Sequence, residues 1–296
     1  MVVRVGITGA SGLIGTALGR RLRERGHAVV DFVRRQPNAD EIRWDPQAGL
    51  LDPSQLDGLD AVVHLAGAGI GSRRWTDAYK RRIRDSRVLG THLLADAIAA
   101  SGGPRILLSG SAVGYYGDTQ ELVDESSPPG DDFLAEVVAE WEAATRAAEA
   151  AGVRVVHLRS GVVLSDRGGA LKKMLPLFKL GLGGRFGNGQ QWMSWISIDD
   201  EVGAIEHLLT SDVHGPVNLT APEPVRNAEF AKTLASVLGR PARVPVPEFG
   251  PRLLLGKEMA QALLFGGQRV DPAVLRAGGY EFRDRRLDEA LRALLA

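Results

Sequence analysis

Apolar residues in this chain fall into short runs separated by longer segments with helical spacing. Runs rich in Val, Ile and Leu occur at residues 2–7, 28–33, 60–65, 104–109, 153–158 and 217–219. Continuous apolar runs of this length predict strands that are buried on both faces of a parallel sheet. The stretches between them, such as residues 16–25 and 73–100, predict helices. This alternation predicts an α/β fold, with a doubly wound parallel sheet of the Rossmann type.

The first strand leads directly into a glycine-rich turn, Thr8–Gly15, with the sequence T-G-A-S-G-L-I-G. Glycine allows a tight turn with positive φ, and its missing side chain lets backbone N–H groups approach a pyrophosphate at the positive end of the next helix. A strand, a glycine loop and a helix in this order predict a dinucleotide site. The alternative is a β–α turn without a ligand. The predicted cofactor-binding residues of the loop are Thr8, Gly9, Ser11, Gly12, Leu13, Ile14 and Gly15.

The end of the second strand bears on the choice of cofactor. In NAD sites an acidic residue at this point binds the ribose hydroxyls, but here the strand ends in Val33-Arg34-Arg35, and Asp31 lies two residues earlier. Guanidinium groups bind phosphate in a bidentate manner. We therefore predict that Arg34 and Arg35 bind the 2′-phosphate of NADP (NADPH), and that NAD is disfavoured. The alternative is a solvated basic turn.

Composition narrows the possible functions. The 296 residues carry equal numbers of acidic and basic side chains and no cysteine. No global field favours nucleic acid or an anionic membrane, and disulfides, thiolate metal sites and a cysteine nucleophile are excluded. The acidic run Asp199-Asp200-Glu201 precedes a helical segment and is more typical of a helix start than of a metal site, so no metal is expected. The first strand begins at Val2 without a signal-like segment, which predicts a cytoplasmic protein. We expect the protein to be a monomer or a homodimer.

Further motifs resemble the extended branch of the short-chain dehydrogenase/reductase superfamily. Besides the glycine loop, these are H-L-A-G-A-G-I at 64–70, R-V-L-G-T at 87–91 and S-G-S-A-V-G-Y-Y-G-D at 109–118. The resemblance places Leu65, Ala66 and Gly67 beside the adenosine side of the cofactor. It also puts Ser111 in the place of the catalytic serine, although Ser111 could simply close a turn, and Tyr116 in the place of the tyrosine of the V-Y-G pair. Because the usual catalytic pair is missing, Tyr116 is the best remaining phenol for proton transfer, with Ser111 as the orienting group. His64 is expected to be a packed strand residue.

The chain departs from this superfamily at its catalytic pair. The superfamily uses Tyr-x-x-x-Lys on the helix after the serine, but none of the four tyrosines here has a lysine four residues later. Phe133 or Leu134 takes the tyrosine position, and Val137 or Val138 takes the lysine position. Neither a phenyl ring nor an alkyl chain can transfer a proton.

This combination resembles an atypical subgroup, the epimerase-family or sugar-nucleotide-epimerase-like proteins of unassigned substrate. Segments 128–144, 158–165, 168–184 and 187–200 carry the resemblance through most of the chain. Arg159 and Val162 follow a strand at the edge where such sheets bind ligands, and we expect them at the cofactor. Substrate contacts are expected from Gln191, Trp192 and Trp195, with tryptophans packed between lobes as the alternative.

These observations predict a Rossmann domain at residues 1–165, to which residues 190–220 return. A smaller α+β substrate lobe follows at 166–296 and includes a helical C-terminal domain at 247–296. The predicted function is an NADP-dependent oxidoreductase or epimerase/dehydratase-like enzyme acting on a small polar metabolite, which could be nucleotide-sugar-like. The alternative is a non-catalytic NADP-binding sensor or assembly factor. The basic residues 73–84 are expected to form a solvated helix face, with a phosphate or carboxylate contact at the site mouth as the second possibility.

Overall fold

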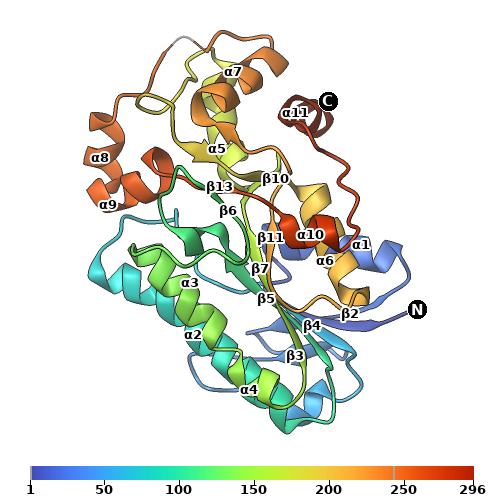
Figure 1. Ribbon diagram of the computed structural model, residues 1–296. Helices are drawn as coiled ribbons and strands as arrows, with labels where there is room; N and C mark the ends of the chain where they lie inside the picture. Colours follow the sequence, from blue (N-terminus) through green and yellow to red (C-terminus); the bar gives the residue numbers. More distant parts are fainter. Residues whose placement is uncertain (1, 243) are drawn as a thin grey trace.

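The computed structural model describes residues 2–242 and 244–296, and its centre is a seven-stranded parallel sheet (Figure 1). In spatial order the strands are β11 (Gly215–Leu219), β7 (Arg154–Ser160), β5 (Ile106–Ala112), β4 (Ala61–His64), β1 (Arg4–Thr8), β2 (Ala28–Val33) and β3 (Glu41–Arg43). This arrangement confirms the predicted doubly wound α/β fold. Strand β11 comes late in the chain, so the polypeptide returns to this sheet after it has begun to build the C-terminal lobe.

Both faces of the sheet are covered by helices (Figure 1). One face packs on α1 (Leu13–Glu24) and α6 (Ile198–Thr210), and the other packs on α2 (Asp77–Ala100) and α4 (Arg146–Ala150). Neighbouring strand residues face opposite cores: Val63 lies in the first and Val62 in the second. This follows from the two-residue period of a strand, and it explains why the strand sequences are apolar throughout.

Polar side chains cap the starts of helices α2, α3 and α6. Ser197 caps α6 by accepting a hydrogen bond from the backbone N–H of Asp200, so the acidic run forms the first turn of that helix, as the helix-start interpretation predicted. Thr76 caps α2 in the same way, and this helix begins at Asp77 rather than at Arg73. Helix α3 (Phe133–Ala143) begins after the cap Asp132. A polar side chain that accepts from a first-turn N–H satisfies a group that the helix itself cannot.

The C-terminal lobe has its own hydrophobic core, which contains Trp195, Phe230 and Leu291. Two small two-stranded sheets contribute to it, β8 (Val162–Leu164) with β10 (Trp195–Ser197) and β9 (Trp192–Met193) with β12 (Val225–Arg226). A third pair joins β6 (Leu122–Val123) to β13 (Arg269–Val270). The helices of the lobe are α5 (Gly169–Lys179), α7 (Asn227–Val237), α8 (Phe249–Leu255), α9 (Lys257–Ala260) and α11 (Leu287–Leu295), whereas α10 (Ala273–Ala277) packs on the main sheet beside β11. Among the described residues, no helix is both long and apolar enough to cross a membrane.

One carboxyl group is enclosed between the sheet and α6. Glu201 is fully buried, and one of its oxygens accepts a hydrogen bond of 2.6 Å from the Ser160 hydroxyl. The other oxygen has no hydrogen-bond partner in the part of the chain that the structure describes. Because burial disfavours the charged form, it raises the pKa of Glu201 to about 8. The folded protein therefore holds this carboxyl protonated at neutral pH.

We predict that Glu201→Gln makes stability less dependent on pH. Between pH 4.5 and about 8 the folded state keeps a proton that the unfolded chain releases. The contribution of Glu201 is thus complete at low pH and is lost as pH rises, by at most about 1.4 kcal/mol per unit. Urea unfolding should be measured from pH 5 to pH 9. The free energy of unfolding of the variant, relative to that of the wild type, should increase as pH rises. The exposed control Glu121→Gln should show no such gain, and a constant difference for Glu201→Gln would contradict the assignment.

Candidate functional site

The glycine loop at the end of β1 is closed by contacts that leave no room for side chains. Gly9 has a φ of +70°, and a Cβ on Gly15 would lie 2.3 Å from the carbonyl oxygen of Gly9. Gly12 occupies the cap position of α1 and offers no side-chain hydrogen bond. The first-turn N–H groups of α1 therefore lack the usual intramolecular cap, an arrangement that suits an anion.

Thr8 fastens this loop to the end of the neighbouring strand β4. Its hydroxyl accepts hydrogen bonds from the backbone N–H groups of Leu65 and Ala66, at 3.1 and 3.3 Å. It also lies 2.7 Å from Nδ1 of His64. His64 is fully buried, and burial lowers its pKa to about 4, so the ring is neutral. His64 is thus a packed strand residue, as expected. Thr8 does not line the cavity itself but holds the lining residues Leu65 and Ala66 in place through its hydroxyl.

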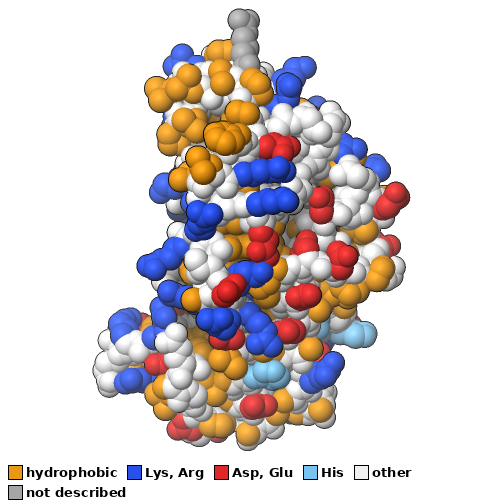
Figure 2. All heavy atoms as spheres, turned by 90° about the vertical axis from the view of Figure 1, so that its left-hand side faces the viewer, with side chains coloured by type: hydrophobic (Ala, Val, Ile, Leu, Met, Phe, Trp, Pro, Cys, Tyr) orange, Lys and Arg blue, Asp and Glu red, His pale blue; other side chains and the backbone are white. Residues whose placement is uncertain are grey.

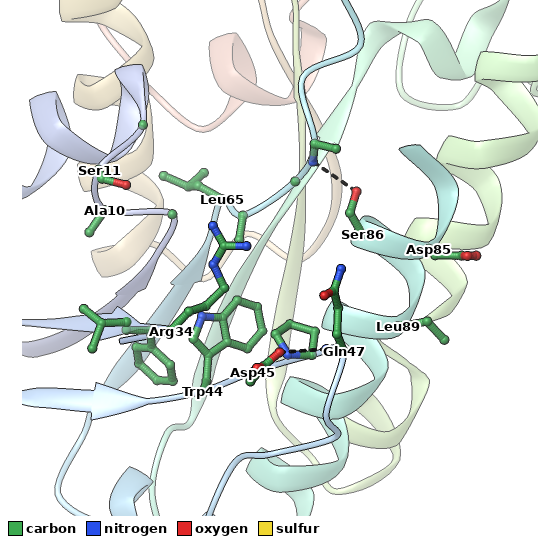
Figure 3. Close-up of a pocket in the computed structure, with 18 of the residues that line it drawn as sticks. Ala10, Ser11, Arg34, Trp44, Asp45, Gln47, Leu65, Asp85, Ser86 and Leu89 are labelled. Atoms are coloured by element: carbon green, nitrogen blue, oxygen red, sulfur yellow. Dashed lines mark hydrogen bonds between the residues drawn. The ribbon is translucent and has the colours of Figure 1, made fainter. Parts of the chain in front are cut away.

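A cavity of about 1380 Å³ opens beside the loop (Figure 3). Many of the residues predicted at the cofactor line it, namely Gly9, Ser11, Gly12, Arg34, Arg35, Leu65, Ala66 and Gly67. Leu13, Ile14 and Gly15 form the first turn of α1 behind this wall. Residues 44–47 after β3 and the α2 residues Ala78, Arg81, Arg82, Asp85, Ser86 and Leu89 also line the cavity. No motif marked residues 44–47, because only the sheet brings them here, whereas Arg81 and Arg82 fit the phosphate-contact possibility for residues 73–84.

The two arginines after β2 have different surroundings. The Arg35 guanidinium donates two hydrogen bonds to the Glu41 carboxylate, at 2.7 and 2.5 Å. This pairing holds the pKa of Glu41 below its usual range. Among the described residues Arg34 has no ion-pair partner, and Figure 3 shows its side chain extending into the cavity. Arg34 is therefore the cation at this strand end that is free to bind a phosphate.

A second polar cluster lies at the carboxyl ends of β5 and β7. The Ser111 hydroxyl donates a hydrogen bond of 2.6 Å to Glu142 of α3. Arg159 donates two hydrogen bonds to the same carboxylate, both at 2.8 Å. Burial alone would raise the pKa of Glu142, but the hydrogen bonds and charge of Arg159 outweigh it and hold the pKa below its usual range. The carboxylate is therefore ionised and faces Ser111.

Tyr116 and Arg159 are held inside this cluster. Arg159 donates to the Tyr116 hydroxyl at 3.0 Å, and that hydroxyl donates to Asn218 at 2.7 Å. Burial raises the pKa of Tyr116 to about 12. Arg159 is only 3% exposed and directs all three nitrogens at protein partners. Instead of the predicted cofactor contact, its guanidinium positions Glu142, a residue that no sequence motif revealed.

The place of the superfamily's catalytic pair is apolar. Phe133 packs against Trp75, with ring centroids 5.2 Å apart, and the Lys80 ammonium lies 4.3 Å from the Phe133 ring centroid. Val137 and Val138 are buried in α3. This segment therefore presents neither a phenol nor an amine for proton transfer, in agreement with the sequence.

The residues predicted to contact substrate are largely committed to packing. Trp195 is fully buried, and its indole donates to the carbonyl of Glu223. The Gln191 amide donates to the carbonyls of Phe186 and Leu264. Trp192 is half-buried between two guanidinium groups, and Val162 is a residue of β8. These positions favour packing over a substrate contact for Trp195, within the core of the C-terminal lobe, and commit the Gln191 amide to backbone carbonyls.

Comparisons with known proteins agree with this geometry. The sequence profile of the NAD dependent epimerase/dehydratase family matches residues 5–220, and a profile described as a domain of unknown function (DUF1731) matches residues 246–294. An epimerase family protein of Mycobacterium bovis is 46% identical over 290 residues, which are 97% of this chain and 96% of that protein. The human epimerase family protein SDR39U1 is 41% identical over 300 residues, which are 99% of this chain and 100% of that protein.

Two solved structures extend the similarity to the whole fold. The crystal structure of human SDR39U1 (isoform 2) with NADPH has a TM-score of 0.89 and 39% identity, and the match covers 98% of each chain. A nucleoside-diphosphate sugar epimerase from Corynebacterium glutamicum has a TM-score of 0.82 and 39% identity, covering 100% of this chain and 58% of that one. With its glycine loop, parallel sheet and small C-terminal domain, this chain belongs to the NAD-dependent epimerase/dehydratase family.

Proposed function

We propose that this protein binds NADP(H) in the cavity beside the glycine loop and uses it in an oxidoreductase or epimerase/dehydratase-like reaction. The observation that carries the proposal is the uncapped start of α1 on the same cavity as the unpaired Arg34. The first suits a pyrophosphate and the second suits an additional phosphate on the ribose. The NADPH in the similar human structure supports the phosphorylated cofactor.

Other cations and polar groups of the cavity support this binding mode. Arg81 and Arg82 of α2 face the same space as Arg34, so the 2′-phosphate would meet positive charge from two elements. Ser86 accepts a hydrogen bond of 3.0 Å from the backbone N–H of Ala68 and so fixes the loop after β4. The cofactor would supply the hydride donor or acceptor, and the protein would supply binding, orientation and a proton path.

We assign that proton path to Ser111 and Glu142. A substrate hydroxyl that donates to the oxygen of Ser111 could release its proton to that oxygen while Ser111 passes its own to the carboxylate 2.6 Å away. Arg159 keeps the carboxylate ionised and oriented. In this assignment Tyr116, the phenol favoured from the sequence, acts indirectly by holding Arg159. We propose a small polar substrate, and nucleoside diphosphate sugars are the first class to test because the similar Corynebacterium protein is described as an epimerase of such sugars.

A non-catalytic NADP(H)-binding protein is the second candidate. The observation that favours it is the apolar segment with Phe133, Val137 and Val138, whose side chains cannot perform the proton transfer of the superfamily's tyrosine and lysine. The buried Ser111–Glu142 pair favours the enzyme, since an ionised carboxylate is costly to bury for packing alone.

We predict that Arg34→Ala and Arg35→Ala affect NADPH binding differently. Loss of a charge-assisted phosphate contact should weaken NADPH binding by about tenfold to a hundredfold in Arg34→Ala and leave NADH binding nearly unchanged. Arg35→Ala serves as the matched control, because its guanidinium already pairs with Glu41. Titration calorimetry with both nucleotides gives the two affinities. Equal losses in the two variants, or losses that are the same for NADPH and NADH, would contradict the assignment of Arg34.

We predict that Ser111→Ala abolishes most turnover while cofactor binding persists. Removal of a positioned proton-transfer group typically costs about 10²–10⁴-fold in rate. Tyr116→Phe should lose less activity, because it keeps the serine and the carboxylate. Turnover of a panel of nucleoside diphosphate sugars, followed by NADPH fluorescence and product chromatography, measures both. If Tyr116→Phe is inactive and Ser111→Ala is active, the proton path is wrong. Tight NADPH binding without turnover of any compound would favour the non-catalytic candidate.

A further inference from the structure

Exposed large hydrophobic side chains gather on the C-terminal lobe. Seven of the eleven that the structure exposes by 44% or more lie in two short segments, 177–182 and 244–254. They are Leu177, Leu180, Leu182, Val244, Phe249, Leu253 and Leu254, which we call the apolar patch. Figure 2 shows hydrophobic side chains collected toward one end of the molecule, with Lys and Arg side chains beside them. A contiguous apolar surface marks an interaction site far more often than scattered residues do.

The sequence around the apolar patch is strongly basic, although the whole chain has a net charge of zero. Residues 167–198 contain five Lys or Arg and no Asp or Glu, and residues 230–247 contain three and again no acid. Two acidic side chains lie close to the patch in the sequence, Glu248 just before α8 and Glu258 in α9, and both form ion pairs. Glu248 contacts Arg252 at 2.6 Å, and Glu258 contacts Lys80 at 2.5 Å. The patch therefore lies in a local excess of positive charge.

A cationic pocket adjoins the apolar patch. It has a volume of about 430 Å³, and Arg185, Lys232 and Arg240 line it without any carboxylate. None of these three cations has an ion-pair partner among the described residues. Alanines of α7 form much of the remaining wall, so the space between the cations stays open. The pocket is built to accept an anionic group.

The pocket and the patch share a backbone segment. Ala242 and Pro245 line the pocket, and the exposed Val244 lies beside Pro245 in the chain. Gly181, between Leu180 and Leu182, lies against Pro241. The pocket and the patch therefore adjoin along these two segments.

We propose that the C-terminal lobe docks on an anionic phospholipid surface. Headgroup phosphates enter the cationic pocket, and Phe249, Leu253 and Leu254 insert among the upper parts of the acyl chains. Apolar side chains bordered by Lys and Arg are the features that bind proteins in the plane of a bilayer interface. The docking is peripheral, since no described helix could span the bilayer. The net charge of zero by itself predicts no attraction to an anionic membrane. The net charge is summed over the whole chain and therefore does not reveal the local excess of basic residues around the apolar patch.

The positive charge around the apolar patch favours an anionic lipid surface over a second copy of the chain as its binding partner. A two-fold interface places the same patch on both subunits. Two cationic pockets and their basic borders would then face each other and repel. An anionic bilayer instead neutralises both at once, with about 1 kcal/mol for each cation near the surface.

Vesicle co-sedimentation of the full chain tests the proposal. We expect binding to vesicles of equal parts phosphatidylcholine and phosphatidylglycerol, release by high salt, and no binding to phosphatidylcholine alone. The double variants Leu253→Ser with Leu254→Ser, and Lys232→Ala with Arg240→Ala, should each lower the affinity by about tenfold or more. Leu122→Ser, at a side chain that is 55% exposed outside the patch, is the matched control and should bind like the wild type.

Four outcomes would overturn the proposal. The first is no binding to the anionic vesicles. The second is binding that both double variants retain. The third is vesicle binding that Lys232→Ala with Arg240→Ala retains although that variant has lost binding of inorganic phosphate, which would assign the pocket to a free phosphate rather than a headgroup. The fourth comes from light scattering run in parallel, in which concentration-dependent dimers lost in Leu253→Ser with Leu254→Ser would assign the patch to a second copy. These outcomes are independent of NADPH binding, which serves as the test of folding for every variant.

Discussion

The close approach of backbone to backbone at the carboxyl end of β1 is the constraint on which the site depends. Gly9 and Gly15 leave no space for a Cβ, and the Thr8 hydroxyl ties the turn to the first residues after β4. Parallel pairing of β1 with β4 brings these loops to the same edge. The start of α1 therefore opens on a cavity instead of packing against protein, an arrangement that suits an anion without any charged side chain in the loop.

A buried ion pair organises the neighbouring part of the sheet. Glu142 and Arg159 come from α3 and β7, and each has little exposed surface. Charges taken out of water remain stable there only when they are paired and hydrogen-bonded, and loss of one partner typically costs about 3–5 kcal/mol. This pair also orients Ser111 and Tyr116, so one interaction joins three secondary-structure elements to the candidate catalytic group. The apolar segment of α3 that replaces the usual catalytic pair lies on the same helix.

The balance of acidic and basic side chains differs between the cofactor cavity and the apolar patch of the C-terminal lobe. Around the cofactor cavity, basic side chains alternate with acids such as Asp31, Glu41 and Asp85. Around the apolar patch, residues 167–198 and 230–247 carry basic side chains and no acidic ones, and the neighbouring Glu248 and Glu258 are paired with Arg252 and Lys80. Electrostatic attraction at physiological salt depends mainly on charges within about 8 Å, so the local excess matters more than the sum over the chain.

The sequence by itself determined the sheet, the glycine loop and the loss of the catalytic pair, because all three depend on residues close together in the chain. Apolar runs fix strands, glycine fixes the turn, and a tyrosine–lysine spacing is either present or absent. Only the tertiary structure decided that Arg35 pairs with Glu41 while Arg34 stays free, that residues 44–47 reach the cavity, and that Glu142 meets Ser111. It likewise enclosed Trp195 and Arg159, which the sequence had placed at ligands. These contacts join residues from separate elements, and pairings of that kind are set by how the sheet and helices pack rather than by local pattern.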